Sequence, residues 1–186
     1  MFSAERPIAG IRIYRRFFDE NRCQDLIDLA EAAKLWVQAP IGRYQNNELV
    51  ESKIDLNLRD VEVCDLADLG IIFPTPEIIA LRDSLASEFD APIDVMSRGM
   101  ISKYAPGSHI RPHRDTGVYT TPRLVTCVLY LNAGYAGGDI TFPQLDWRFT
   151  PQIGDCISFY SEYLHGVDEI TNGTRYCIVW FGETQS

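Results

Sequence analysis

The stretch of sequence that decides the fold is YAPGSHIRPHRD, residues 104–115, which carries His113 and ends in Asp115. His165 follows fifty residues after Asp115. Side chains two positions apart on an extended segment point the same way, so His113 and Asp115 can reach one ion. Two histidines and one carboxylate are the protein ligands of a facial iron(II) site, which leaves the other face of the metal open for chemistry. The pattern therefore predicts an iron site, with His165 arriving from a different strand.

A single His-x-Asp pair is weak evidence on its own, because it occurs by chance in many chains. The alternative interpretation is a loop histidine beside a solvated carboxylate. The chain holds three histidines, and only His109 lies outside the predicted set. His109 stands four positions before His113 and is interpreted as a loop residue rather than as a fourth ligand.

The composition limits the class of protein. A chain of 186 residues with 46% hydrophobic and 23% charged residues is typical of one soluble globular domain. The formal net charge of -9 argues against a nucleic-acid surface and against binding to an anionic membrane. No apolar signal region and no membrane-length run is found. The five cysteines show no CxxC spacing, which favours reduced thiols in a cytoplasmic protein.

The first half of the chain predicts two helices. One runs from Glu20 to about Leu35 with Asp19 as its N-cap, and the other begins at Pro76 and ends near Phe89. The expected apolar positions are Leu26, Ile27, Leu29 and Ala30 in the first helix, and Ile78, Ile79, Leu81, Leu85 and Phe89 in the second. Residues 8–18 look extended, whereas residues 40–53 are polar and are expected to form an irregular lid or substrate loop.

From Asp94 onward, short apolar runs alternate with Gly and Pro. We expect strands near residues 95–104, 123–131, 139–142, 146–149, 155–160 and 174–182. Two helices followed by about six antiparallel strands indicate an α+β, mainly β fold, a sandwich or barrel with the helices on one outer face.

Four segments between Met100 and Gly182 together resemble the iron(II)- and 2-oxoglutarate-dependent dioxygenases, in the prolyl-4-hydroxylase-like branch. The segment YAPGSHIRPHRD looks like the family's His-x-Asp signature, and RLVTCVLYLNAGYAGGDITFP is similar to its strand, turn and Gly-Gly-acid-Thr-Phe-Pro segment. PQIGDCISF resembles the strand before the distal histidine, and HGVDEITNGTRYCIVWF resembles that histidine followed by the basic residue that binds 2-oxoglutarate.

The resemblance implies a double-stranded β-helix, or jelly roll, over residues 96–186, with residues 1–95 as a helix-rich supporting part of the same single domain. It implies an enzyme that uses Fe(II), 2-oxoglutarate and O2, with ascorbate as an optional further cofactor. His113, Asp115 and His165 are then the metal ligands. The implied reaction converts 2-oxoglutarate to succinate and carbon dioxide and hydroxylates an unactivated C–H bond. Halogenating relatives replace the ligand carboxylate by a small residue, so Asp115 favours hydroxylation, with desaturation or cyclisation as open alternatives.

The far carboxylate of 2-oxoglutarate needs a buried cation, and the resemblance assigns this role to Arg175, whose planar guanidinium can pair with both carboxylate oxygens. The alternative is a surface arginine paired with Asp168 or Glu169. Tyr130 and Tyr104 match tyrosines that line the cosubstrate pocket in relatives, with core tyrosines as the alternative. Thr126 is a further candidate for that carboxylate, because Leu124, Thr126, Val128 and Tyr130 share one face of the predicted strand.

The expected partner is a small-molecule or peptidyl substrate, with no nucleic acid and no membrane, and the sequence carries no signal for an oligomeric state. A prolyl residue, a free amino acid and a small metabolite all remain open as substrates. Residues 40–60 and 116–122 are expected to shape that choice. Arg59 is a candidate for meeting an anionic substrate, with a solvated arginine as the alternative.

Three other classes of protein stay open at this stage. A cupin-like iron oxygenase that does not use 2-oxoglutarate shares the ligands but gives no reason for Arg175. A nucleic-acid demethylase of the wider superfamily shares the ligands but is disfavoured by the acidic charge. A non-catalytic metal-binding module would need the open face of the metal to be occupied.

Overall fold

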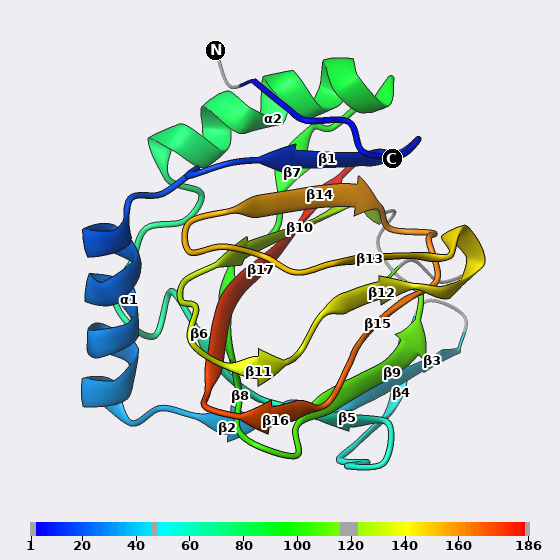
Figure 1. Cartoon of the computed structure of the whole chain (residues 1–186). Helices are drawn as coiled ribbons and strands as arrows, with labels where there is room; N and C mark the ends of the chain where they lie inside the picture. The colour runs from blue at the N-terminus through cyan, green and yellow to red at the C-terminus, as the bar shows by residue number, and fades with distance from the viewer. Residues whose placement is uncertain (1–2, 46–47, 116–122, 185–186) are drawn as a thin grey trace.

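The computed structural model describes residues 3–45, 48–115 and 123–184. Over these residues the chain folds into antiparallel sheets with two α-helices on the outside (Figure 1). The helices are α1 (Glu20–Ala33) and α2 (Pro76–Phe89), and η1 (Pro143–Leu145) is a short 3-10 turn. No helix within the described ranges is long and apolar enough to cross a membrane.

The larger sheet has eight strands. In spatial order they are β1 (Ile11–Tyr14), β14 (Cys156–Tyr160), β10 (Arg123–Tyr130), β17 (Arg175–Glu183), β8 (Met100–Tyr104), β6 (Glu62–Asp65) and β2 (Val37–Gln38), with β7 (Val95–Met96) paired to β17. A sheet of five strands faces it. Its order is β13 (Trp147–Phe149), β12 (Ile140–Phe142), β15 (His165–Val167), β9 (His109–His113) and β5 (Arg59–Asp60). Two further ribbons are β11 (Ala136–Gly137) with β16 (Ile170–Asn172), and β3 (Ile41–Gln45) with β4 (Glu48–Lys53).

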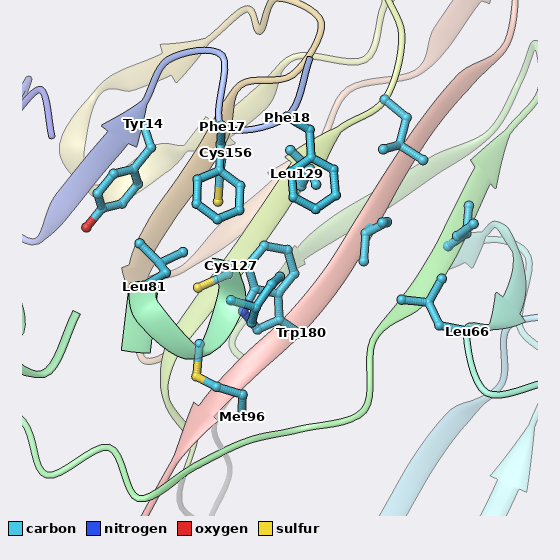
Figure 2. Packing of buried hydrophobic residues seen from close by; sticks show 14 of the residues in the cluster. Tyr14, Phe17, Phe18, Leu66, Leu81, Met96, Cys127, Leu129, Cys156 and Trp180 are labelled. Carbon is cyan, nitrogen blue, oxygen red and sulfur yellow. The ribbon is translucent and has the colours of Figure 1, made fainter. Parts of the chain in front are cut away.

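Alternation along the central strands of the larger sheet creates two apolar layers. On β10, Val125, Cys127 and Leu129 face outward and pack with the helices, whereas Val128 and Tyr130 face the smaller sheet. Figure 2 shows the outer layer, where Cys127 of β10 lies opposite Trp180 of β17. The helices thus cover one face of the larger sheet and leave the space between the two sheets for a site. This is the arrangement of a mainly β jelly roll, as predicted.

The two helices form where the sequence predicts them. The Asp19 side chain accepts a hydrogen bond of 2.9 Å from the backbone N–H of Arg22, which caps α1. The predicted apolar stripes are too wide, however. Leu29 and Ile79 were expected to be buried, but they are 42% and 44% exposed, because each helix contacts the sheet along a narrower line.

The structure corrects two expectations for the first half of the chain. Residues 41–45 and 48–53 are not irregular but pair as the strands β3 and β4 of a hairpin. Backbone pairing holds a hairpin without an apolar alternation, so its polar composition concealed it from the sequence. Residues 1–95 are also less helical than expected, since β1, β2 and β6 belong to the larger sheet and β5 to the smaller one.

Candidate metal centre and cosubstrate pocket

His113, Asp115 and His165 come together at one end of the space between the sheets. One ligand atom from each residue lies within 4.8 Å of the others. The carboxylate of Asp115 stands between the two imidazoles, with 3.3 Å from Oδ1 to His113 Nε2 and 3.3 Å from Oδ2 to His165 Nε2. The two imidazole rings are 4.4 Å apart, centroid to centroid. Three donor atoms therefore converge on one point, as a metal site requires.

The pairing of β9 with β15 sets this geometry. His113 lies directly opposite His165, whereas Ile110 lies opposite Val167, so three residue steps on β9 match two on β15. This bulge lets both Ile110 and His113 face the cavity. Gly166 makes the bulge fit, because a Cβ there would lie 2.9 Å from the carbonyl oxygen of Ile110.

The hydrogen bonds of the two imidazoles leave the correct nitrogen free. Nδ1 of His113 lies 3.0 Å from the backbone oxygen of Arg111, and Nδ1 of His165 lies 2.9 Å from that of Tyr163. A carbonyl oxygen only accepts, so each Nδ1 must donate and each Nε2 is free to bind a metal.

Asp115 is held as an ionised carboxylate. Burial raises its pKa, but the adjacent side chains of His113 and His165 outweigh burial and hold the pKa of the carboxyl well below its usual range. The Thr126 hydroxyl donates to Oδ2 at 2.8 Å, and Ser161 Oγ lies 2.9 Å from the same hydroxyl. The backbone N–H of Asp115 donates to the Ser161 carbonyl at 2.9 Å. Two neutral imidazole nitrogens and one carboxylate, each oriented by a hydrogen bond, are a donor set that fits Fe(II).

Arg175 lies at the other end of the same space and is only 1% exposed. Its guanidinium carbon stands 4.4 Å from the ring centre of Tyr104 and 5.0 Å from that of Tyr130. Among the described residues, its Nε and Nη1 have no hydrogen-bond partner, and neither do the hydroxyls of Tyr130 and Tyr135. A buried cation without an anion is costly, so these groups point to an anionic ligand.

The tyrosines around Arg175 are neutral hydrogen-bond donors. Burial raises the pKa of Tyr104 and of Tyr135 to about 12, although the charge of Arg175 works in the opposite direction on both. Burial likewise holds the pKa of Tyr130 well above its usual value. A guanidinium with neutral phenols beside it suits a carboxylate, which only accepts hydrogen bonds.

One cavity of about 160 Å³ joins the two ends. His113, Asp115, His165, Arg175 and Tyr104 all line it. Thr126, which donates to Asp115, and Tyr130, beside Arg175, lie four residues apart on β10, so the two groups stand at opposite ends. Arg175 is not a surface arginine paired with Asp168, because Asp168 lies 3.5 Å from Arg148 instead. The cavity is thus able to place one end of a small dicarboxylate at the metal site and the other at Arg175.

Other predicted residues fall in different places. The Thr126 hydroxyl donates to Asp115, and its role toward the cosubstrate stays a prediction. Leu124 packs on the outer layer rather than beside Thr126, because the register shifts between Arg123 and Val125. The ring nitrogens of His109 lie 3.1 and 3.2 Å from backbone oxygens, away from the three-residue group. The segment 116–122 lies outside the described residues.

Sequence reasoning missed two residues of the site. Ser161 completes the hydrogen bonds behind Asp115, and no local pattern distinguishes it from other serines. Tyr135 stands beside Arg175 in the turn YAGG, where a large aromatic residue among glycines was an available signal.

The chain is similar to known oxygenases in sequence and in fold. Residues 99–182 match the family model described as the 2OG-Fe(II) oxygenase superfamily. A protein of Acanthamoeba polyphaga mimivirus, provisionally named a prolyl 4-hydroxylase, is 22% identical over 165 residues, which cover 77% of this chain and 68% of that protein.

Solved structures of prolyl hydroxylases share the fold. The Pseudomonas putida prolyl-4-hydroxylase aligns with a TM-score of 0.72 at 16% identity, covering 95% of this chain and 94% of that one. The viral collagen prolyl hydroxylase of Paramecium Bursaria Chlorella virus-1, in its 2-oxoglutarate complex, gives 0.68 at 19% identity, covering 92% and 94%. A Trichoplax adhaerens prolyl hydroxylase, in complex with a hypoxia inducible factor peptide fragment, gives 0.70 at 15% identity, covering 94% and 83%.

Proposed function

We propose a hydroxylase function for this chain, which is an oxygenase of the Fe(II)- and 2-oxoglutarate-dependent superfamily in its prolyl-4-hydroxylase-like branch. In the proposed reaction, an unactivated C–H bond of a prolyl residue, an amino acid or a small metabolite becomes C–OH. One O2 is consumed, and 2-oxoglutarate leaves as succinate and carbon dioxide.

The observation that carries the proposal is the single cavity with three converging donors at one end and an unpartnered guanidinium at the other. In this proposal His113 Nε2, His165 Nε2 and the Asp115 carboxylate hold iron. Bound iron supplies O2 activation coupled to the decarboxylation of a 2-oxo acid. Thr126 and Ser161 keep the Asp115 carboxylate in place.

The far end of the cavity orients the cosubstrate. Arg175 donates N–H groups to the distal carboxylate, and the Tyr130 hydroxyl is free to donate a further hydrogen bond. The rings of Tyr104 and Tyr130 stand beside the guanidinium and exclude water from it. The ion pair formed in this dry pocket fixes the 2-oxo end at the metal.

The substrate is the less constrained part of the proposal. The Trichoplax relative was solved with a peptide fragment, which supports a peptidyl substrate, while the size of the cavity is compatible with an amino acid or a small metabolite. Asp115 fills the ligand position that a halide would need, which supports hydroxylation. The cytoplasmic location expected from the cysteines, all five of which are free and buried, stays a prediction.

The test is a screen for substrate-stimulated succinate formation with Fe(II) and 2-oxoglutarate, using free amino acids beside proline-containing peptides. We expect succinate with the wild type and none with His113→Ala. Under ¹⁸O2, one labelled oxygen atom enters succinate and the other enters the product. A product without new oxygen contradicts hydroxylation and leaves the cosubstrate assignment standing, whereas a wild type that makes no succinate contradicts the proposed function itself.

A further inference from the structure

A second arginine, Arg59, lines the same cavity as the three metal-binding candidates and Arg175. Arg59 opens the short strand β5 and lies directly opposite Ile110 of β9, which also lines the cavity. Directly opposed residues of two neighbouring strands project on the same side of the sheet. The backbone pairing therefore aims the Arg59 side chain into the space between the sheets.

The half-buried Arg59 makes no ion pair with a carboxylate in the described part of the chain. Its Nε is buried and makes no hydrogen bond, and no described carboxylate lies within ion-pair distance of it. The adjacent Asp60 accepts a hydrogen bond from Gln38 at 3.2 Å instead. A solvated surface arginine keeps its nitrogens in water, so the buried Nε speaks against that interpretation of Arg59.

A charge count shows that the expected cosubstrate does not need Arg59. Fe(II) and the Arg175 guanidinium together carry three positive charges, and Asp115 and the two carboxylates of 2-oxoglutarate carry three negative ones. Arg123, the third arginine of the cavity, lies 3.6 Å from Glu183 and stacks on Phe181. The loaded cavity therefore retains one uncompensated positive charge, on Arg59, in a setting where an unpaired charge is costly.

Arg59 is also within reach of the reaction centre. Ile110, its neighbour on β9, precedes His113 by three residues, about 10 Å along a strand. Arg175 and Arg59 both act to lower the pKa of Tyr104, against the larger effect of burial, so the Arg59 charge lies near the wall of the cavity formed by Tyr104. Arg59 and the three metal-binding candidates thus line one small cavity.

We propose that Arg59 binds an anionic group of the substrate, a carboxylate held a few bonds from the carbon that is hydroxylated. The inference rests on the proposed function and narrows its substrate class from any C–H compound to a carboxylated one. The carboxylate has three sources with the same chemistry: a free amino acid, the C-terminus of a peptide, or an acidic side chain.

The experiment is calorimetry on protein loaded with redox-inert Zn(II) and 2-oxoglutarate, so that binding is measured without turnover. The probes are N-acetyl-L-proline and its amide, which differ by one negative charge. L-proline, acetyl-Gly-Pro and acetyl-Pro-Glu-amide represent the three sources, and each is compared with the amide that lacks its carboxylate: L-prolinamide, acetyl-Gly-Pro-amide and acetyl-Pro-Gln-amide. We expect the wild type to bind at least one carboxylated probe about 10- to 100-fold more tightly than its amide, the range for one charged hydrogen-bonding contact.

Arg59→Gln is expected to abolish this preference while leaving the affinity for 2-oxoglutarate and the melting temperature unchanged. Arg111→Gln on β9 removes the same charge from an exposed position and serves as the matched control that keeps the preference. A loss of 2-oxoglutarate affinity in Arg59→Gln would assign Arg59 to the cosubstrate and overturn the inference.

The inference is equally overturned if no carboxylated probe binds the wild type more tightly than its amide, whether or not either binds. The two levels of the argument stay distinguishable. Succinate formation by the wild type without a carboxylate preference contradicts only the role of Arg59, whereas a carboxylate preference without succinate formation contradicts only the proposed reaction.

Discussion

The two ends of the cavity differ in how completely their polar groups are satisfied. At the metal end, Asp115 accepts a hydrogen bond from Thr126 and lies 3.3 Å from Nε2 of each imidazole, and each imidazole is fixed by a backbone oxygen. At the other end, Arg175 and Tyr130 hold buried polar atoms with no partner among the described residues. The metal end is thus organised before anything binds, whereas the Arg175 end, the proposed cosubstrate end, keeps polar atoms that a ligand can pair with.

Removing a ligand at the organised end should have the largest effect. His113→Ala, Asp115→Ala and His165→Ala are each expected to abolish succinate formation, because each change deletes one of three direct metal contacts. Iron content after dialysis should fall in parallel, while circular dichroism shows an intact fold. His109→Ala, a histidine on the same strand outside the group, is the control and should retain activity. Normal turnover in any of the three variants would show that the ligand set is wrong.

The cosubstrate end should respond next most strongly. Arg175→Ala is expected to cost on the order of 2–5 kcal/mol of 2-oxoglutarate binding, because it removes a buried charged partner. Arg175→Lys keeps the charge but loses the planar fork, so a smaller rise in the KM for 2-oxoglutarate is expected. Iron content should be unchanged in both variants. Wild-type affinity of Arg175→Ala for 2-oxoglutarate, measured by calorimetry, would rule out this role.

A change that removes the hydrogen bond to Asp115 but keeps all three metal ligands should have a milder effect on iron binding. Thr126→Val deletes the hydroxyl that donates to Asp115 and preserves the shape of the side chain. Iron affinity is expected to fall about 10- to 100-fold, as for other partners of metal ligands. The affinity for 2-oxoglutarate in the iron-loaded protein should change little. The opposite pattern, with iron retained and 2-oxoglutarate binding lost, would place Thr126 at the cosubstrate after all.

The smallest effect is expected from removing a single hydroxyl group beside Arg175. Tyr130→Phe removes one free donor and keeps the ring beside Arg175. The expected loss is about 0.5–1.5 kcal/mol of 2-oxoglutarate binding. The unliganded protein should be no less stable than the wild type in thermal unfolding, because the hydroxyl has no partner to lose. A clear destabilisation would mean that the hydroxyl is already used within the protein.

Local signals made the helices and the metal-site residues predictable. Asp19 is the N-cap of α1 and Pro76 is the first residue of α2, so local residues predict where both helices begin. His113 and Asp115 are two positions apart, so their ability to reach one metal ion can be predicted from the spacing without knowledge of the fold. Arg175 was found through family resemblance, which carries long-range information that no local pattern contains.

Features that depend on pairing between distant strands were not predictable. Strict alternation places Ile110 and His113 on opposite faces of β9, and only the bulge against β15 brings both into the cavity. The same holds for Thr126, whose hydroxyl meets Asp115 because β10 passes behind the metal end. Register between strands is set by the whole core, so it cannot be read from either strand alone.

If Arg175 binds 2-oxoglutarate as proposed, its Nε and Nη1, which have no partner among the described residues, link the lifetime of the protein to the supply of that cosubstrate. A ligand that binds only the folded state stabilises it by RT ln(1 + [L]/Kd), about 2.7 kcal/mol when the ligand stands at one hundred times Kd. Proteases and chaperones act on the unfolded fraction, so a change of this size alters abundance several-fold. In that case a cell short of 2-oxoglutarate would hold less of the protein, in addition to limiting its turnover, without a separate regulator.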